Sequence, residues 1–266
     1  MRSLFAVLPL LAAATVPAAA QETRPEQTAA SPDGSIVLTV STDNDQRPIW
    51  SLSRKGKLLI APSKLGFLLT DGIALQRGFA IESAERASGD TRWEQPWGER
   101  RFVRDRHNEL LVRFRQNESW GGHTMNVRFR LFDDGIGFRY ELPEQAGLQT
   151  AKISDEITEF DIAPKGTAWW ITGGEWNRYE QIYQQTPIDA VSTAHTPITM
   201  RLDDGTHLAF HEAALVDYAG MWFKRVEGQK FRATLSPSSQ GPRVVRDLPF
   251  ATPATGWRGI SVPRRV

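Results

Sequence analysis

Cysteine is absent from this 266-residue sequence, which excludes disulfides, thiol catalysis and cysteine-ligated zinc sites. The sequence also lacks a Gly-rich phosphate loop, a His-Glu-x-x-His metal motif and a Gly-x-Ser-x-Gly nucleophile elbow. A charge excess is missing as well, because 32 basic and 31 acidic residues leave a net charge of +1. No basic run is long enough to follow a phosphate backbone, so nucleic acid is not an expected partner.

The N-terminus has the composition of an export signal. Arg2 precedes an apolar stretch from Leu4 to Val16, and alanines occupy positions 18–20. This pattern predicts a signal peptide over residues 1–20, cleaved before Gln21. The stretch is shorter than the roughly 20 apolar residues that a membrane span needs. We therefore expect a periplasmic or secreted protein that does not stay in the membrane after cleavage.

Beyond a polar segment expected to be a linker (residues 21–30), short runs alternate between apolar and polar residues. In the clearest run, Met125, Val127, Phe129 and Leu131 are interleaved with Asn126, Arg128 and Arg130. This period of two predicts strands with one buried face, and Asp-Gly pairs at 71–72, 134–135 and 204–205 predict turns between them. No helix of three turns is expected. The pattern predicts one all-β antiparallel sandwich over residues 31–250, followed by an irregular or truncated tail, 251–266.

Aromatic side chains are the feature most suggestive of a ligand. Nine tryptophans occur, and the segment around Trp97 and Glu99 combines aromatic rings with polar groups, as a sugar-binding surface does. The alternative is that most of these rings fill the core. His211, Glu212 and Ala213 form a second candidate at the end of a predicted strand, although neighbouring side chains on a strand point to opposite faces. A long polar loop, 180–197, carries Asp189 as a potential calcium ligand.

Six segments, in order, resemble the N-terminal domain of glycoside hydrolase family 97, a family of exported α-glucosidases and α-galactosidases. They are Ser31–Gly34, Trp97–Glu99, Phe132–Tyr140, Ala168–Trp170, Thr186–Pro187 and His211–Tyr218. The resemblance implies a galactose-mutarotase-like β-super-sandwich that is followed by a catalytic (β/α)₈ barrel. It also implies that His211, Glu212 and Ala213 line the sugar site. A family glutamate that binds calcium corresponds to Ala190 here, which leaves Asp189 as its only nearby substitute.

The resemblance predicts a carbohydrate-binding domain that completes the pocket of an α-glycosidase and is truncated before the barrel. Because paired carboxylates on that barrel perform the hydrolysis, the chain alone is expected to be inactive. Its expected partners are an α-linked oligosaccharide and the catalytic barrel. Two alternatives are a free-standing aldose-mutarotase-like isomerase and a periplasmic carbohydrate-binding protein. The residues do not distinguish glucosides from galactosides.

Overall fold

The computed structural model describes residues 25–148, 150–175, 177–213 and 218–236, together with two short strands at 247–249 and 258–261. The predicted signal peptide lies outside these residues. Within them, the only helices are two single 3₁₀ turns, η1 (Glu118–Trp120) and η2 (Ile188–Ala190). In the same residues, no helix is long and apolar enough to span a membrane. The prediction of an all-β fold with antiparallel sheets is confirmed.

Two large antiparallel sheets and one small sheet make up the fold. The eight-stranded sheet has the order β1 (Gln27–Ala30), β2 (Ile36–Thr42), β3 (Pro48–Arg54), β4 (Lys57–Lys64), β12 (Glu159–Ile162), β19 (Lys230–Leu235), β18 (Met221–Glu227), β15 (Thr193–His195). The nine-stranded sheet has the order β14 (Gln184–Pro187), β13 (Gly166–Trp170), β16 (Ile198–Leu202), β17 (His207–Glu212), β21 (Arg258–Ser261), β10 (Gly135–Glu141), β9 (Thr124–Phe132), β8 (Phe102–Gln116), β7 (Phe79–Glu94). The small sheet contains β20 (Asp247–Pro249), β11 (Thr150–Glu156), β5 (Phe67–Leu69) and β6 (Ala74–Leu75).

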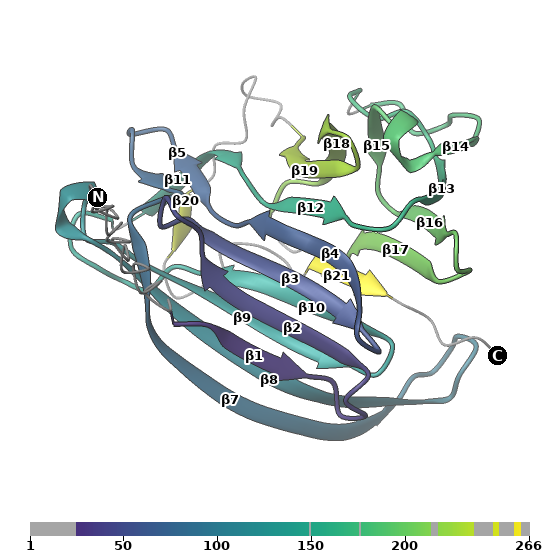
Figure 1. The fold of residues 1–266 in the computed structure, drawn as a ribbon, viewed down its shortest axis with the longest axis horizontal. Coiled ribbons are helices and arrows are strands. Elements are labelled where there is room, and N and C mark those ends of the chain that lie inside the picture. Colours follow the sequence, from purple (N-terminus) through teal and green to yellow (C-terminus); the bar gives the residue numbers. More distant parts are fainter. Residues whose placement is uncertain are drawn as a thin grey trace, which may run out of the picture.

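The core lies between the two large sheets, where β2 and β3 lie over β9 and β10 (Figure 1). The alternation predicted for β9 is present, because Met125, Val127, Phe129 and Leu131 are all fully buried. Arg128 and Arg130 project from the opposite face. At the centre, Phe160 lies within 5–7 Å of four other aromatic rings, measured between ring centroids. The sandwich is therefore stabilised by burial of apolar surface and needs no disulfide.

Two segments expected to be irregular contain strands instead. Gln27–Ala30, the end of the expected linker, form β1 and pair with Val37–Val40 of β2. In the expected tail, Arg258–Ser261 form β21, which pairs with β17 on one side and β10 on the other. The physical reason is the same in both cases. Without β1 or β21, a neighbouring strand would present unpaired N–H and C=O groups at its edge. Neither strand shows a clear alternation in the sequence.

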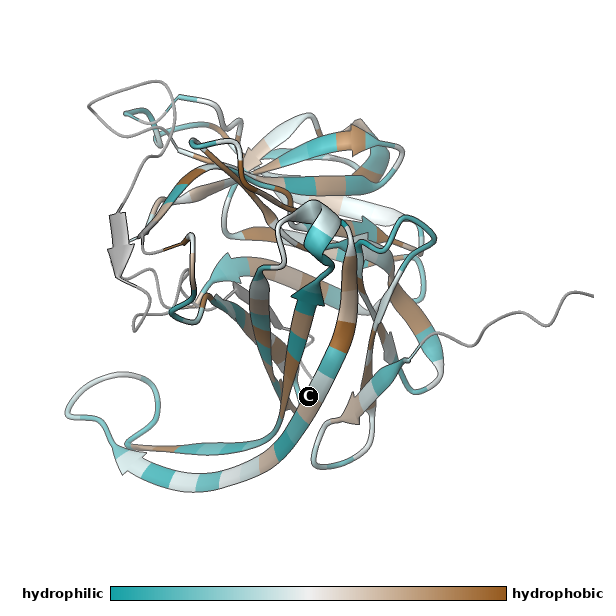
Figure 2. Ribbon diagram, turned by 90° about the vertical axis from the view of Figure 1, so that its left-hand side faces the viewer, coloured by the Kyte–Doolittle hydropathy of each residue, from teal (hydrophilic) through white to brown (hydrophobic). Residues whose placement is uncertain are grey.

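The alternating pattern of the sequence predicts a strand over Glu109–Arg115, the inner part of β8, but not the long hairpin of β7 and β8. The two strands pair from Phe79 with Gln116 to Glu94 with Phe102. Most of β7 is exposed, because its outer half extends past the end of β9. Figure 2 shows this hairpin curving out of the body of the domain. Its tip carries the segment around Trp97.

Candidate functional site

The tip of the β7–β8 hairpin is an exposed aromatic surface. The exposed fractions are 82% for Trp97, 50% for Trp93 and 43% for Phe102. The Arg92 guanidinium lies 3.9 Å from the centroid of the Phe102 ring, a cation–π geometry. Glu99 is also exposed. These side chains offer flat apolar faces beside charged and hydrogen-bonding groups, which is the combination predicted for this segment.

The turn at the tip is held by its own hydrogen bonds. The Gln95 side-chain amide donates to the carbonyl oxygen of Arg100 at 2.5 Å, and the Gln95 backbone N–H donates to the carbonyl of Arg101 at 2.9 Å. Lower in the hairpin, Arg104 donates two hydrogen bonds to Asp90, which lower the pKa of the Asp90 carboxyl. These exposed contacts add little stability, but they limit the orientations that the tip can take.

Glu212, at the end of β17, connects the two large sheets. Its Oε1 accepts a hydrogen bond from the Met221 backbone N–H at 2.7 Å, at the start of β18. Its Oε2 accepts one from the Thr196 hydroxyl at 3.1 Å, next to the cis peptide bond between Thr196 and Pro197. Both carboxylate oxygens are therefore engaged in holding strand ends together. Glu212 therefore holds the surrounding loops in place, and each of its carboxylate oxygens already accepts a hydrogen bond from the protein.

Tyr179 and His195 pack beside Glu212. The Tyr179 hydroxyl donates to the carbonyl oxygen of Thr196 at 2.9 Å, and its ring lies 4.8 Å from the His195 ring between centroids. Burial raises the pKa of Tyr179, and the charges of Tyr183 and Glu212 raise it further. Tyr179 and Tyr183 are 51% and 62% exposed. Together these residues form a second surface that joins aromatic rings to an acidic group.

His211 points away from this second surface. On β17, Leu208 and Phe210 are fully buried in the core, and Glu212 shares their face because side chains alternate along a strand. His211 therefore lies on the outer face of the sheet, as expected for adjacent residues, and Ala213 follows as an exposed residue. Mutarotase-like catalysis needs a histidine and a glutamate that converge on one sugar, and the adjacent pair His211 and Glu212 does not converge.

The five residues predicted for sugar binding do not form one pocket. Glu212 lies level with Leu110 of β8 through the pairing of β17, β21, β10, β9 and β8. β17 and β8 are four strand spacings apart in this sheet, which is about 19 Å at about 4.8 Å per spacing. From Leu110 to Phe102, before the tip, β8 continues for about 27 Å at about 3.4 Å per residue. Trp97 and Glu99 thus belong to one surface, and Glu212 belongs to another.

Comparison with known proteins places this architecture in a family. The family described as Glycosyl-hydrolase 97 N-terminal matches residues 29–266. The chain belongs to glycoside hydrolase family 97. The resemblance seen in the six sequence segments is therefore confirmed.

A solved family 97 enzyme and two curated proteins are similar to this chain. A family 97 enzyme from Pseudoalteromonas sp. strain K8, solved in complex with panose, is 40% identical with a TM-score of 0.80, covering 89% of this chain and 35% of that chain. A retaining alpha-galactosidase of Bacteroides thetaiotaomicron is 22% identical over 76% of this chain and 30% of its own length. A probable retaining alpha-galactosidase of Streptomyces bingchenggensis is 28% identical over 81% of this chain and 34% of its own length. The chain thus spans about a third of the length of these relatives.

The calcium ligand suggested by the family pattern lies apart from other ligands. Asp189 is exposed on η2, between the buried Ile188 and Ala190, whose methyl group cannot ligate a metal. Among the residues that the structure describes, no group of three or more His, Asp or Glu side chains is placed to hold a metal ion. Calcium takes six to eight oxygen ligands. The described residues of this chain therefore do not fit a calcium site by themselves.

Sequence reasoning identified most residues of the second surface but not their contacts. Glu212 was assigned to a strand end and His195 falls in the loop 180–197 that follows Tyr179, with no reason in the sequence to bring the three together. The connection that Glu212 makes between the two large sheets depends on the Thr196 hydroxyl and on the backbone N–H of Met221. A backbone donor has no signature in the sequence. A polar residue beside a proline, as in Thr196-Pro197, is too common a pattern to identify Thr196 as a partner of Glu212.

Proposed function

We propose that this chain is the carbohydrate-binding N-terminal domain of an exported family 97 α-glycosidase, which contributes contacts to a sugar pocket and does not hydrolyse substrate alone. The family match supports the first part, and the panose and acarbose complexes of the Pseudoalteromonas enzyme support an oligosaccharide as the ligand. The names of the curated relatives support α-galactosides. Both α-glucosides and α-galactosides are therefore candidate substrates of the whole enzyme.

The observation that carries the proposal is the exposed hairpin tip. Trp97 is 82% exposed and Trp93, four residues before it, is 50% exposed, so this hairpin presents two large apolar rings to solvent. Where exposed apolar side chains form a contiguous patch, they mark a site of interaction with a ligand or another protein surface. Because pyranose rings have flat C–H faces bordered by hydroxyls, Trp97 and Trp93 suit stacking, and Glu99 suits hydrogen bonding to the hydroxyls.

The expected lack of hydrolysis follows from the chemistry of glycoside cleavage. The reaction needs two carboxyl groups that face one glycosidic bond at a fixed separation. Glu212, the predicted site carboxylate, has both oxygens bonded to the protein, and Glu99 lies far from it on the hairpin. We propose that the catalytic pair belongs to a (β/α)₈ barrel of the whole enzyme.

Replacing Trp97 tests the carbohydrate-binding role. We expect panose or melibiose to shift the Trp97 indole N–H resonance of the 266-residue chain, with a dissociation constant on the order of 1 mM. Trp97→Ala should weaken this binding at least about tenfold, because removing a stacked ring costs binding free energy at the centre of the contact. NMR titration followed at several resonances measures the dissociation constant for both proteins.

Trp120→Ala is the matched control, because Trp120 is 45% exposed on η1 and lies at the opposite end of β8 from the tip. It should bind both sugars as the parent chain does. If neither sugar shifts any resonance, or if the two variants lose binding equally, the proposed role of the tip is wrong. Release of glucose or galactose from the sugars by the parent chain would contradict the non-catalytic part of the proposal.

For calcium, we propose that the whole enzyme receives at most one side-chain ligand, Asp189, from the described part of this chain. Removing calcium with EDTA should therefore leave the melting temperature of the domain unchanged within about 1 °C, because a single exposed carboxylate gives no stabilising metal site. Asp189→Asn should behave in the same way. Differential scanning calorimetry with EDTA and with added calcium measures this, and a calcium-dependent rise that Asp189→Asn abolishes would contradict it.

A further inference from the structure

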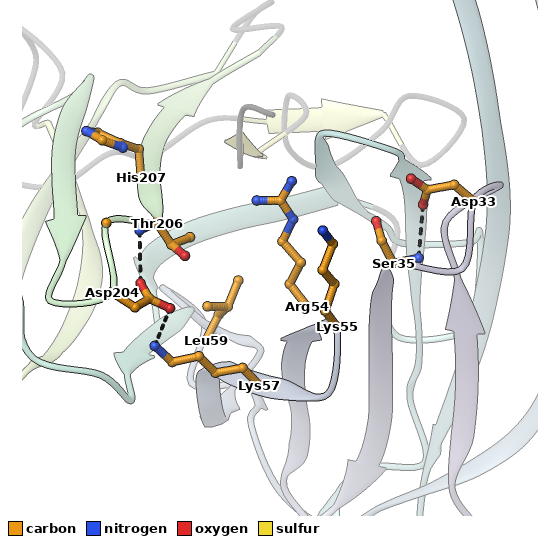
Figure 3. Close-up of a pocket in the computed structure, with 10 residues that line it drawn as sticks. Asp33, Ser35, Arg54, Lys55, Lys57, Leu59, Asp204, Thr206 and His207 are labelled. Atoms are coloured by element: carbon orange, nitrogen blue, oxygen red, sulfur yellow. Dashed lines mark hydrogen bonds and ion pairs between the residues drawn. The ribbon is translucent and has the colours of Figure 1, made fainter. Parts of the chain in front are cut away.

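A cavity of about 620 Å³ opens between the two large sheets at the end that carries the β3–β4 and β16–β17 turns. Figure 3 shows its lining, in which basic side chains from the first turn face the second. The lining residues used below are Asp33, Ser35, Arg54, Lys55, Lys57, Asp204 and Thr206. None of them belongs to the hairpin tip or to the surface around Glu212. The cavity is therefore separate from both surfaces described above.

Part of the charge in the cavity is already neutralised. Lys57 Nζ lies 2.6 Å from Asp204 Oδ2. The hydrogen bond from Lys57, together with one from the Thr206 backbone N–H, lowers the pKa of Asp204 to about 2. Asp204 is therefore anionic at any ordinary pH, and it neutralises Lys57. This pair ties the β3–β4 turn to the β16–β17 turn and forms one wall of the cavity.

Arg54 and Lys55 differ from Lys57 in this respect. Their side chains make no hydrogen bond or ion pair with any residue that the structure describes. The Nε of Arg54 and the hydroxyl of Ser35 are both buried from solvent and lack a hydrogen-bond partner among those residues. A buried donor without a partner destabilises a protein, and a ligand that accepts its hydrogen bond removes that cost. Two cations and two unsatisfied polar atoms thus lie around one space, whose lining also includes the Asp33 carboxylate, which accepts hydrogen bonds from the Ser31 hydroxyl and the Ser35 backbone N–H.

We propose that this cavity binds an oxyanion, a phosphate or sulfate group, either free or as an ester of a hydroxylated small molecule such as a sugar. A guanidinium offers several N–H donors in a plane that matches the oxygens of such a group. Lys55 adds a second positive charge, and the Ser35 hydroxyl, unpaired among the described residues, adds a donor. The cavity has room for a monosaccharide beside the anionic group, since small-ligand pockets range from about 300 to 1,000 Å³.

Three probes distinguish the ligand chemistry when each is titrated into the 266-residue chain by calorimetry, at matched ionic strength. They are inorganic phosphate, glucose 6-phosphate and glucose. We expect phosphate and glucose 6-phosphate to bind and to compete with each other, whereas glucose should not displace phosphate. Tighter binding of glucose 6-phosphate identifies a sugar ester as the preferred source of the anion, and equal binding identifies the free anion.

Arg54→Gln should weaken phosphate binding at least about tenfold, because hydrogen bonds to a charged group are the stronger class. Ser35→Ala should weaken it less. Lys224→Gln removes one charge from an exposed position on β18 and serves as the matched control, so it should bind phosphate as the parent does. Circular dichroism establishes that each variant is folded.

The proposal is overturned if phosphate fails to bind, or if Arg54→Gln and Lys224→Gln weaken binding equally, since either result leaves no specific site. It is also overturned if glucose alone displaces phosphate. These results do not depend on sugar binding at Trp97, because Trp97→Ala should leave phosphate binding unchanged. A failure of the anion site can thus be told apart from a failure of the proposed function.

Discussion

Phe160→Ala is expected to lower the free energy of unfolding by about 3–5 kcal/mol, the usual cost of removing a large buried aromatic side chain. Phe160 is 1% exposed. Its ring centroid lies 5.1 Å from that of Phe223 in the same sheet and 5.6 Å from that of Phe210 in the facing sheet. The substitution removes contacts within one layer and between the two layers. The resulting cavity is surrounded by rigid rings and cannot collapse fully.

Phe102→Ala is the matched control, because Phe102 is 43% exposed on the hairpin and packs outside the core. Its expected loss is about 0.5 kcal/mol or less, as for most surface substitutions. Urea denaturation, followed by circular dichroism, gives both values. A loss of less than about 1 kcal/mol for Phe160→Ala would mean that the sheets do not pack against each other through this residue.

The sequence predicted those parts of the fold in which one face of a strand is buried. β9 was predicted because its apolar residues alternate, and the Asp204-Gly205 pair was correctly placed in a turn, with Gly205 at a φ of 80°. β1, β21 and the outer half of β7 were missed. Their place is decided by backbone pairing with other strands, and backbone hydrogen bonds do not depend on side-chain alternation.

The candidate sites were predictable to a lesser degree. Composition singled out the aromatic segment at Trp97 but left open whether its rings fill the core, and the structure shows Trp97 exposed. In contrast, the engagement of Glu212 depends on the way in which two sheets meet, and the cavity beside Arg54 depends on two turns that are distant in sequence. Long-range geometry of this kind places polar groups without leaving a local motif. A family resemblance identifies candidate site residues such as Glu212, but it does not predict which groups they contact in this chain.

The outer face of the nine-stranded sheet presents a further case of long-range charge pairing. Arg128 donates to Glu141 at 2.7 Å and also contacts Glu109. Arg130 donates to Glu109 at 2.9 Å, and Arg139 donates to Glu141 at 2.9 Å. Glu109 and Arg128 have side chains only 12% and 23% exposed. Among the contacts of the described strands, Arg128 is thus the one residue of this group that binds both Glu109 and Glu141.

Arg128→Met should therefore cost about 1–3 kcal/mol of stability at pH 7, because it leaves two half-buried carboxylates with fewer donors. Burial alone raises the pKa of Glu109, but the hydrogen bonds from Arg130 and Arg128 outweigh it and hold the pKa below its ordinary value of 4.5. The pKa of Glu141 is lowered in the same way by Arg128 and Arg139, against the effect of burial.

Because both folded pKa values are depressed, the stabilisation is complete above pH 4.5 and is lost as the pH falls through the lower folded values. The loss caused by Arg128→Met should accordingly shrink between pH 7 and pH 3, because below pH 4.5 the unfolded chain takes up protons that Arg128 disfavours in the folded parent. Arg113→Met is the matched control, since Arg113 is 41% exposed and its nearest carboxylate oxygen, on Glu85, is 4.0 Å away. Its effect should be small at both pH values. An equal loss for Arg128→Met at pH 7 and pH 3, measured by urea denaturation, would show that Arg128 stabilises the sheet by packing instead of by charge.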